Sequence, residues 1–525
     1  MKLVNMQKRN CSVHLLYGLE FFWLKVYPIF FALAVLVLFS HQASASVSLL
    51  DVVKTALEQA SGVQLQRENL RSSESDVLAA RSAFDPQVSL SFGYRHDALS
   101  AFSGSDLKTV TSTLSSSTLL PSGLIIQPSI LVEGHSASGA VSSSVASSGI
   151  TFTLPLMEGF GENSLRTALS ANRKVYQAER YALQHAVSTT IYGAALAYWN
   201  YLYAYQALKL DQQLREKAEE SYRATQALAG AGEIALVRSE QAHAYLQQAE
   251  VAEVSSAQLL RQSWNALFLA MGTSLAGREK PEEPADLFPL PDNDLSMLTD
   301  ISELQAHALA FRADLQVLQL QGEAANDLLS GSRNRMKPKV DLDLWAGYSG
   351  QHSGSSVTDY LSSVASEVPG LNVSATLRYT FQARNSSDEA AFLRSRSQYE
   401  KTVITRQDLE RSITSGVGLA ADAVGNAASV WRLSMQSTRT YRLLYAAELK
   451  KYKMGMSDLF KVQSVSTDLA SAEKQLLGAE KAYAVSLLAL RFEAAWITRE
   501  RDGSYGIEQQ DLMTLPALKI SRNKP

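Results

Sequence analysis

The feature that most constrains this chain is a long stretch that contains no helix-breaking residue except one glycine. Between Leu165 and Leu228 there is no proline, Gly193 is the only glycine, and apolar and small residues recur at helical spacing. A helix over residues 162–229 would be roughly 100 Å long at ~1.5 Å per residue, which is longer than a single soluble core requires. The pattern predicts an elongated molecule built on this helix, with a turn at Gly232.

A second helix is predicted to run back along the first one, over residues 233–271. It has small residues at seven-residue intervals with leucines beside them, a pattern that brings two helices close together along a shared axis. The small residues are Ala242, Ala249, Ser256, Ser263 and Ala270.

The same order of elements is predicted twice, so we expect one body made of two similar halves rather than several domains. Each half has a helix, a β-hairpin, a long helix and a return helix. The first repeat covers 46–272, with its hairpin at 87–156, and the second covers 301–496, with its hairpin at 339–382, long helix at 388–454 and return helix at 457–496. A Pro- and acid-rich linker, 273–300, joins them, and residues 497–525 are expected to form an irregular tail.

The amino end has the pattern of an export signal, residues 1–45. Basic residues precede an apolar run at 29–39, and Ala43-Ser44-Ala45 supplies small residues at the spacing of a cleavage site. The alternative is a membrane anchor, but the run is much shorter than the ~20 residues of a spanning helix. The one cysteine, Cys11, lies in this segment, so the mature chain is expected to have no disulfide and no thiolate metal site. No later segment has the length and apolarity of a membrane helix, so any membrane crossing must use strands.

The predicted hairpins have one apolar and one polar face. Val88, Leu90, Phe92 and Tyr94 alternate with polar or small residues, which indicates a strand between water and an apolar environment. The Ser/Thr/Gly-rich stretch 97–148 is expected to be the poorly defined far part of the first hairpin, with short strand pieces at 124–126 and 130–132. This interpretation gives four membrane-suited strands per chain.

Four strands cannot close a barrel, and an open sheet edge in lipid leaves unpaired backbone groups that cost several kcal/mol each. Copies of the chain must therefore share one wall. Two copies would give eight strands and a mostly filled interior, whereas three would give twelve and a wet lumen, so a homotrimer is favoured. The predicted fold class is an α+β membrane protein, a trimeric twelve-stranded barrel continued by an α-helical tunnel. An ordinary helical bundle without a channel is the alternative.

Several classes of function are not supported by the sequence. The formal net charge of −3 gives no electrostatic footprint for nucleic acid, and the eight histidines form no metal-binding or catalytic motif. Gly416 to Ala421 superficially resembles a dinucleotide fingerprint but lies in a helical run, where small residues serve packing. Asp341 and Asp343 form a carboxylate pair on one strand face, which we assign to a wet lumen rather than to acid–base chemistry. We expect no enzyme activity, no cofactor and no metal.

The chain resembles the TolC family of outer-membrane exit ducts. The resemblance covers roughly 48–496 and depends on the order and duplication of motifs that are individually weak. These are Ala80-Arg81-Ser82-Ala83-Phe84-Asp85-Pro86-Gln87-Val88, the passage Pro155 to Gly161, Arg312-Ala313-Asp314-Leu315, and the two glycine turns.

The resemblance implies a passive homotrimer in the outer membrane of a Gram-negative-type cell, in contact with outer-membrane lipid and extending into the periplasm. It further implies a periplasmic adaptor protein and an inner-membrane transporter as partners, in a tripartite efflux or type I secretion system. The alternative is a structural periplasmic coiled-coil or adhesin-like trimer without transport activity.

In the family, hydrophobic-Gly-hydrophobic turns at the periplasmic tip contact the adaptor. Met454-Gly455-Met456 fits this pattern, whereas the turn at Gly232 departs from it because Glu233 replaces the second hydrophobic residue. The resemblance thus implies an adaptor-contacting tip made of Gly232, Glu233, Met454, Gly455 and Met456.

The family often has aspartates shortly after the second turn, where they constrict the closed pore. Lys461 and Ser464 occupy those places here, Asp458 lies one turn earlier, and the first half has Arg238. We expect a basic or mixed constriction that favours anionic cargo. The alternative is that Lys461 and Arg238 are solvated charges on a helix surface.

Overall fold

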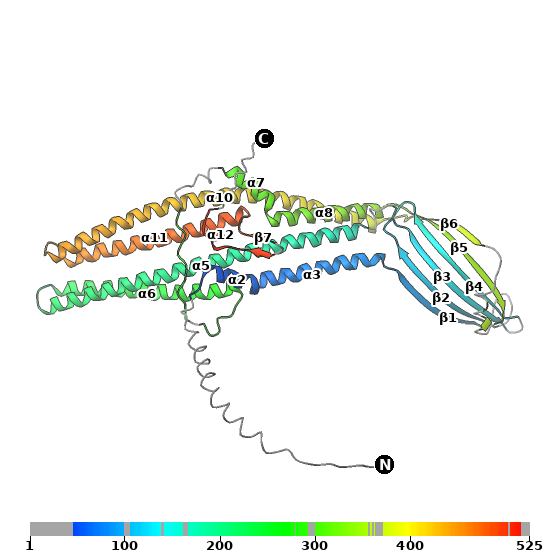
Figure 1. The fold of residues 1–525 in the computed structure, drawn as a ribbon, viewed down its shortest axis with the longest axis horizontal. Helices are drawn as coiled ribbons and strands as arrows, with labels where there is room; N and C mark the ends of the chain where they lie inside the picture. The colour runs from blue at the N-terminus through cyan, green and yellow to red at the C-terminus, as the bar shows by residue number, and fades with distance from the viewer. Residues whose placement is uncertain are drawn as a thin grey trace, which may run out of the picture.

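The structure is a computed structural model. It describes residues 46–98, 106–137, 141–160, 166–278, 280–291, 300–354, 358–359, 362, 371–501 and 504–515. The predicted export signal, 1–45, with Cys11, lies outside these residues. The molecule is elongated, with a β-sheet at one end and two helical turns at the other (Figure 1).

Four long helices make up most of the length. Helix α5 spans Thr167–Gly230 and α6 Leu236–Met271, while α10 spans Ser386–Lys453 and α11 Leu459–Glu493. Each pair forms an antiparallel helical hairpin (Figure 1). No helix in the described part has an apolar stretch long enough to cross a bilayer.

The small residues at seven-residue steps lie where the helices pack. Ala242 and Ala249 of α6 are buried. Helix α11 also has small residues at a seven-residue step, and two of them, Ala472 and Ala479, are buried. Because these side chains are short, the backbones of adjacent helices can approach closely along their full length.

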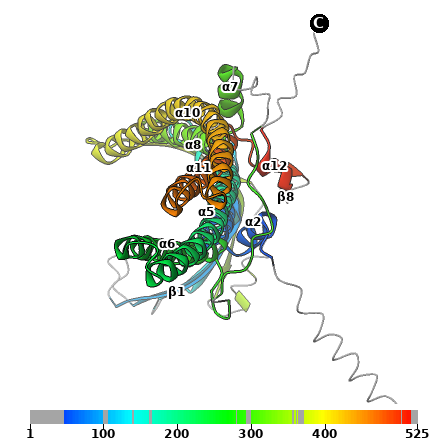
Figure 2. The ribbon, with the colours of Figure 1, turned by 90° about the vertical axis from the view of Figure 1, so that its left-hand side faces the viewer.

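The helices form a curved layer one helix thick. Toward the turns each helix contacts the next in the order α6, α5, α11, α10, and toward the sheet the order is α3 (Ser61–Arg81), α5, α8 (Ala313–Arg335), α10. Seen from the turn end, the row follows an arc rather than surrounding a closed core (Figure 2). This arrangement differs from an ordinary helical bundle.

Each of the two shorter helical segments is interrupted once, although the sequence predicts continuous helices. Helix α2, Leu49–Gln59, is separated from α3 by Ala60, and α7, Ile301–Phe311, is separated from α8 by Arg312. Both separating residues have extended backbone, with ψ of 129° at Ala60 and 120° at Arg312.

Tertiary packing explains the first interruption. A Cβ atom on Gly272 would lie 2.6 Å from the carbonyl oxygen of Gln59, and Gly272 has a φ of +71°, which favours glycine. The end of α6 thus packs directly on the α2–α3 break.

Among the residues that the structure describes, the sheet has six antiparallel strands in sequential order. The first half supplies four and the second half two. They are β1 Gln87–Asp97, β2 Leu107–Leu119, β3 Ile125–Ala137, β4 Ser143–Pro155, β5 Lys339–Ser353 and β6 Asn372–Thr380.

The expectation of four strands per chain, with a single hairpin over 87–156, is therefore wrong. The two strand pieces predicted at 124–126 and 130–132 belong to the single strand β3, and β2 was not predicted. Strand β2 has Ser112 and Ser116 at positions that share a face with Val110 and Leu114, so the apolar alternation that identifies β1 is diluted. Backbone pairing with β1 on one side and with β3 on the other stabilises it instead.

The main hydrophobic core lies midway along the helices, where α2, α5, α6, α11 and the segment after α6 meet. Tyr198 and Trp199 are fully buried there. The Tyr198 hydroxyl donates to Asp286 at 2.8 Å, and Val47 forms a parallel bridge with Pro284. Residues 280–291 of the predicted linker are thus bound to the body.

The described part of the C-terminal tail is ordered, in contrast to the irregular tail predicted for 497–525. Strands β7, Arg499–Arg501, and β8, Ser504–Gly506, form a hairpin, and helix α12 spans Gln509–Met513. Leu512 is buried, and the Arg491 guanidinium donates to the Thr514 carbonyl at 2.6 Å. These short elements have no strong periodicity of their own and are held by contacts with the end of α11.

Candidate functional site

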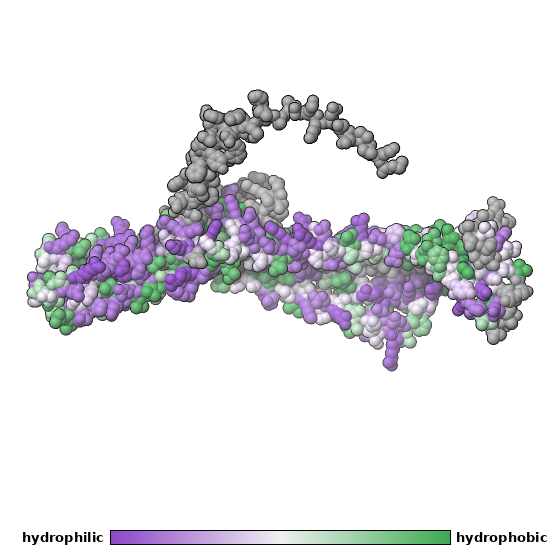
Figure 3. Space-filling model, turned by 90° about the horizontal axis from the view of Figure 1, so that it is seen from below, coloured by the Kyte–Doolittle hydropathy of each residue, from purple (hydrophilic) through white to green (hydrophobic). Residues whose placement is uncertain are grey.

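One face of the sheet has apolar residues on each of the six described strands, with serines interspersed in β2. The predicted alternation in β1 is confirmed, because Val88, Leu90, Phe92 and Tyr94 lie on the same face and are 61–77% exposed. The strand register places apolar residues of the other strands on this face, and a hydrophobic patch lies at the sheet end of the molecule (Figure 3). Exposed members include Leu114, Ile130, Ile150, Phe152, Leu344, Tyr348, Val373, Leu377 and Tyr379. An exposed apolar surface of this extent marks an interaction site.

Aromatic residues lie near both ends of this apolar face. Tyr379 and Phe152 lie toward the helices, and Tyr94 and Tyr348 toward the far end of the sheet. Tyr379 of β6 is paired with Val340 of β5, and Val340 lies eight residues before Tyr348 along β5 (348 − 340 = 8). Eight residues cover roughly 26 Å of strand, or about 20 Å of height in a strand tilted by ~40°, which is comparable with the apolar band of a membrane sheet.

The opposite face of the sheet is polar and hydrogen-bonded. The Thr153 hydroxyl donates to Asp343 at 2.6 Å, and the Arg378 guanidinium lies 3.3 Å from the same carboxylate. Lys339 lies 3.6 Å from Asp341. The predicted carboxylate pair thus shares one face, as expected, and each member has a cationic partner. This pairing suits a polar lining better than acid–base chemistry.

Trp345 of β5 lies on the polar face, next to two glycines. These glycines, Gly149 of β4 and Gly347 of β5, are paired with each other. A Cβ atom on Gly149 would lie 2.6 Å from Trp345 Nε1, and one on Gly347 would lie 2.4 Å from the Ser148 carbonyl oxygen. The glycines make the space in which the Trp345 indole lies flat against the sheet.

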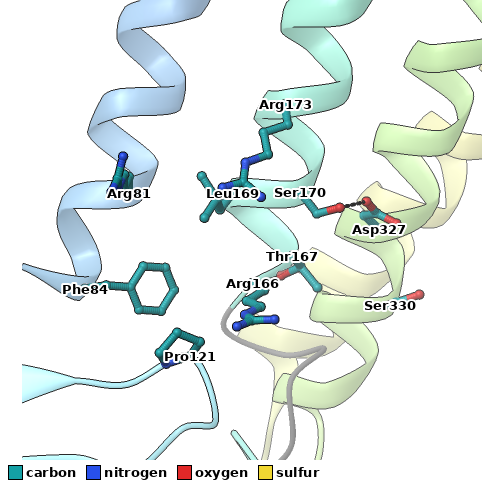
Figure 4. Close-up of a pocket in the computed structure, with 10 residues that line it drawn as sticks. All are labelled: Arg81, Phe84, Pro121, Arg166, Thr167, Leu169, Ser170, Arg173, Asp327 and Ser330. Atoms are coloured by element: carbon teal, nitrogen blue, oxygen red, sulfur yellow. Dashed lines mark hydrogen bonds between the residues drawn. The ribbon is translucent and has the colours of Figure 1, made fainter.

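A cavity of about 790 Å³ lies at the joint between the helices and the sheet (Figure 4). Arg81, Arg166 and Arg173 line it, together with Pro121 from the β2–β3 turn. Nearby, the Ser170 hydroxyl donates to Asp327 at 2.6 Å and fixes α5 to α8 (Figure 4). The joint is therefore rich in positive charge on the side that the turn of the β2–β3 hairpin contacts.

The two turns at the far end of the molecule have the same backbone geometry. Gly232 and Gly455 have φ of +78° and +71°, and each follows a long helix. The Glu233 amide donates to the Leu228 carbonyl at 3.0 Å, and the Met456 amide donates to the Lys451 carbonyl at 2.9 Å. These bonds form Schellman-type C-caps, which require a left-handed residue at the glycine position.

Both turns present apolar side chains to solvent. Met454 is 53% and Met456 66% exposed in the second turn, and Leu236 is 74% and Val237 67% exposed just after the first. The turn at Gly232 therefore has exposed apolar residues in spite of Glu233. The tip predicted from the sequence included only residues next to the glycine, and not Leu236 and Val237, which lie four and five residues after Gly232.

The residues of the predicted constriction lie on the helices that follow the turns, and the structure connects the two helices. The Arg238 guanidinium lies 5.2 Å from the centroid of the Phe460 ring, and the Thr467 hydroxyl donates to the Tyr245 hydroxyl at 2.7 Å. Arg238, Lys461 and Ser464 are exposed. Phe460 was not among the predicted residues, although its place beside Lys461 could have suggested it.

Asp458 has a structural role at the start of α11. Its carboxylate accepts the Lys461 amide at 2.8 Å and caps the helix. The preceding Ser457 donates to Glu448, which Lys451 approaches at 3.2 Å, and these two hydrogen bonds hold the pKa of Glu448 below its usual range. An aspartate that directly precedes a helical pattern is a recognisable capping signal.

A charged network fixes the break between α7 and α8. The Arg312 guanidinium lies 2.7 Å from Asp314 and 2.5 Å from Glu493 of α11. Burial alone would raise the pKa of Asp314, but hydrogen bonding and attraction to Arg312 outweigh it, so the pKa lies below its usual value.

Gly416, the first residue of the stretch that resembles a dinucleotide fingerprint, lies inside α10 and does not follow a strand. A Cβ atom there would lie 2.9 Å from the Glu493 side chain, so the glycine serves packing.

A buried carboxylate joins three long helices midway. Asp211 of α5 is 1% exposed, accepts a hydrogen bond from Ser256 of α6 and lies 2.5 Å from the Lys474 ammonium of α11. Such a contact fixes the register of neighbouring rods.

Comparisons with known proteins agree with this arrangement. A family model described as outer membrane efflux protein matches residues 52–273, while no curated protein matches the chain. Similar solved structures include the Campylobacter jejuni CmeC outer membrane channel, at 15% identity, covering 85% of this chain and 85% of that chain, with a TM-score of 0.63.

Two further structures are similar. The open state of the Neisseria gonorrhoeae MtrE outer membrane channel has 17% identity and a TM-score of 0.59, and it covers 85% of this chain and 88% of that one. The Vibrio cholerae outer membrane protein VceC has 13% identity and a TM-score of 0.62, and it covers 85% and 95%. These likenesses establish the fold.

Proposed function

We propose, from the premise that this chain is a TolC-family outer membrane efflux protein, that it forms the passive exit duct of a tripartite efflux or type I secretion system. The family consists of channels, not enzymes, and places the chain in the outer membrane, extending into the periplasm. The observation that carries the proposal is a sheet with one apolar and one polar face, attached end-on to a curved, one-layer wall of long helices (Figures 1 and 2).

The division of polarity within the sheet supports a membrane wall around water. The apolar face, with aromatic residues near both ends, suits lipid, and the face with Asp341, Asp343 and Arg378 suits a wet lumen. The arginine-rich joint at Arg81 and Arg173 would lie near the membrane boundary, where anionic headgroups attract positive charge.

Two incomplete features of one copy support a homotrimer. The helical layer is an arc, and the sheet is open, so neither encloses a lumen alone. Exposed apolar residues along the helices, such as Val251 and Val254 of α6 and Leu433 of α10, would be covered by neighbouring copies. Two internal repeats, 46–272 and 301–496, in each of three copies would complete the wall.

The tip is proposed to contact a periplasmic adaptor, which in turn contacts an inner-membrane transporter. The two turns have similar backbone geometry, and each has exposed apolar side chains, Leu236 and Val237 at the first and Met454 and Met456 at the second. Photo-crosslinkers at Met456 are expected to capture the adaptor in cells that express it. A crosslinker at Glu400, an exposed residue in the sheet-side part of α10, is a matched control and should capture none.

The constriction is proposed to be basic or mixed, with Arg238 and Lys461 near the pore and Asp458 and Ser464 beside them. Arg238 is already held against Phe460, so its charge is fixed close to the second turn. Lys461→Asp should shift the ion selectivity of the channel toward cations. The control Lys401→Asp, in the sheet-side part of α10 and distant from the turns, should not. Cation selectivity unchanged by Lys461→Asp would contradict this assignment.

Purified protein reconstituted in planar bilayers provides the principal test. Heat-modifiable trimers in the outer-membrane fraction and discrete single-channel conductance are expected. Trimers that remain soluble in the periplasm and never conduct would instead support the structural coiled-coil alternative.

A further inference from the structure

We infer that the membrane wall of this duct has eighteen strands, with β1 of one copy paired antiparallel to β6 of the next. This inference rests on the proposed function and replaces the twelve strands that the family resemblance implies. Each copy contributes six strands, and three copies give 3 × 6 = 18. The partner of each sheet edge is a second copy of this chain.

Both outer strands of the sheet have a free edge among the residues that the structure describes. Strand β1 pairs with β2 and β6 pairs with β5, and no other strand borders either. Every described residue of β6, and all but the last of β1, is exposed. In lipid each unpaired backbone group costs several kcal/mol, so the two edges must be covered by hydrogen-bonding partners.

The β2–β3 hairpin belongs to the wall and does not lie on top of it. It forms ladders with β1 on one side and with β4 on the other, so the four strands of the first half form one continuous sheet. Leu114 of β2 and Ile130 of β3 are 44% and 41% exposed on the apolar face, like Ile150 of β4 at 41%. The middle of the hairpin therefore has apolar side chains on the same face as β4, although Ser112 and Ser116 of β2 make this face less apolar than in β1.

The directions of the edge strands permit closure. With six strands in sequential antiparallel order, β1 and β6 run in opposite directions, so β6 of one copy meets β1 of the next in antiparallel orientation. This head-to-tail contact differs from a two-fold contact and closes into a ring when the rotation fits.

The strand register supports the geometry of a barrel. Direct partners across the sheet lead from Ser89 through the middle strands to Asn372, the first residue of β6. In a closed barrel, Ser89 of the next copy pairs with a later residue of β6 than Asn372. If that residue is Arg378, the register shifts by six residues over six strands (378 − 372 = 6). At ~3.3 Å per residue and ~4.8 Å between strands, the tilt is about 35°, and pairing with Thr380 gives about 43°. Both lie within the usual 35–45° of membrane barrels.

The same pairing matches the two faces. Ser89, Arg378 and Thr380 all lie on the polar face, so the apolar face continues without interruption from one copy to the next. Barrel diameter grows roughly linearly with strand number, so the eighteen-stranded wall is about half again as wide as a twelve-stranded one. The helical tunnel is unchanged, so the duct widens at its membrane end.

Paired cysteines test the edge contact in the full-length protein. The mature chain is expected to lack cysteine, so Ser89→Cys combined with Arg378→Cys or Thr380→Cys introduces the only thiols. One of these pairs should give disulfide-linked dimers and trimers on oxidation, whereas Ser89→Cys with Ser374→Cys, a control on the same face, should not. Disulfide-linked dimers without linked trimers would overturn the inference. So would intact trimers in which no pair of β1 and β6 cysteines forms a disulfide.

Removal of the hairpin tests the strand number. Replacing residues 98–140 by a two-residue turn leaves β1 antiparallel to β4 and should give a twelve-stranded trimer. Polymers added at the barrel end should then be excluded at a radius about one third smaller, a readout that does not depend on the narrow helical end. An unchanged cut-off contradicts the inference alone. Absence of channels from the full-length chain contradicts the proposed function, and if the shortened chain does not assemble, the cysteine pairs decide.

Discussion

The two halves of the chain have the same order of long helices but different amounts of sheet. Helices α5 and α10 have 64 and 68 residues, and α6 and α11 have 36 and 35. In the described part of the chain, the first half supplies four strands of the sheet and the second supplies two. Helix lengths are constrained because each rod packs against its neighbours from the sheet to the turn. A sheet has no such constraint across its width, since an added hairpin leaves the direction of the flanking strands unchanged.

The halves also differ in how their short helices are interrupted. Ala60 in the first half is packed against the backbone near Gly272, and Arg312 in the second half is held by Asp314 and Glu493. The same bend is thus stabilised by close packing in one half and by charge in the other. Substitutions in matching places can separate these contributions.

The largest effect is expected from charge on the apolar face. Ile130→Arg in β3 and Leu344→Arg in β5 change residues that are 41% and 42% exposed on the same face. Each should destabilise the assembled protein by about 2–4 kcal/mol near the membrane midplane and reduce the yield of heat-modifiable trimers. Ser129→Arg, on the polar face beside Ile130, is the control. Tolerance of Ile130→Arg together with loss from Leu344→Arg would mean that β3 does not face lipid.

A smaller effect is expected at the break between α7 and α8, which is held by charged side chains. Asp314→Asn should cost about 1.5–3 kcal/mol, because it removes the bidentate contact with Arg312. The pKa of Asp314 in the folded state lies below its ordinary value of 3.8. Its contribution to stability is therefore complete above pH 3.8 and is lost as the pH falls below that value.

Hydrogen exchange, corrected for intrinsic rates, checks this prediction. Protection of residues 301–315 should fall in acid, while residues 49–63 around Ala60 should change less. In Asp314→Asn the acid-dependent loss at 301–315 should be reduced. Equal acid sensitivity of both breaks would argue that charge is not the difference between them.

A comparable or smaller cost is expected where the second half packs on the first. Gly347→Ala places a Cβ 2.4 Å from the Ser148 carbonyl oxygen and 2.7 Å from the Trp345 ring, which should destabilise the β4–β5 contact by about 1–3 kcal/mol. Gly93→Ala in β1, with its nearest atoms at 3.9 Å, is the control. The temperature at which trimers dissociate should fall for Gly347→Ala and remain unchanged for Gly93→Ala.

The smallest effect is expected at the turns. Helix α11 begins with the Asp458 cap, whereas Ala235 before α6 has no side-chain cap. Asp458→Ala should destabilise the first turn of α11 by about 0.5–2 kcal/mol, and Ala235→Asp should stabilise α6 by a similar amount. Exchange of amides 459–462 and 236–239 measures both. Asp458→Asn keeps the cap without the charge, so a change in ion selectivity with normal protection would assign Asp458 to the constriction.

The helical part of the fold was largely predictable from the sequence. Long runs of helical spacing with seven-residue steps identify the rods, and glycines mark their ends, because local periodicity and tertiary packing favour the same structure. The breaks at Ala60 and Arg312 were not predicted, because neither residue is a glycine or proline and the bends depend on contacts with Gly272 and Glu493.

The sheet was predictable only where its strands are strongly apolar. Strand β1 has an uninterrupted alternation from Val88 to Tyr94, whereas β2 places serines among its apolar positions and depends on its neighbours for stability. At the turns, the exposed apolar side chains of Met454 and Met456 were foreseen. The contact of Arg238 with Phe460 and the capping by Asp458 depend on distances that sequence spacing does not give.

The β2–β3 insertion has a consequence for how such ducts can evolve. A ring of antiparallel strands built from identical subunits stays closed only if each subunit gains or loses an even number of strands, since an odd change would bring parallel edges together. Bore size in this architecture is therefore available in discrete increments, one hairpin per subunit at a time, while the helical section and its docking end can remain the same.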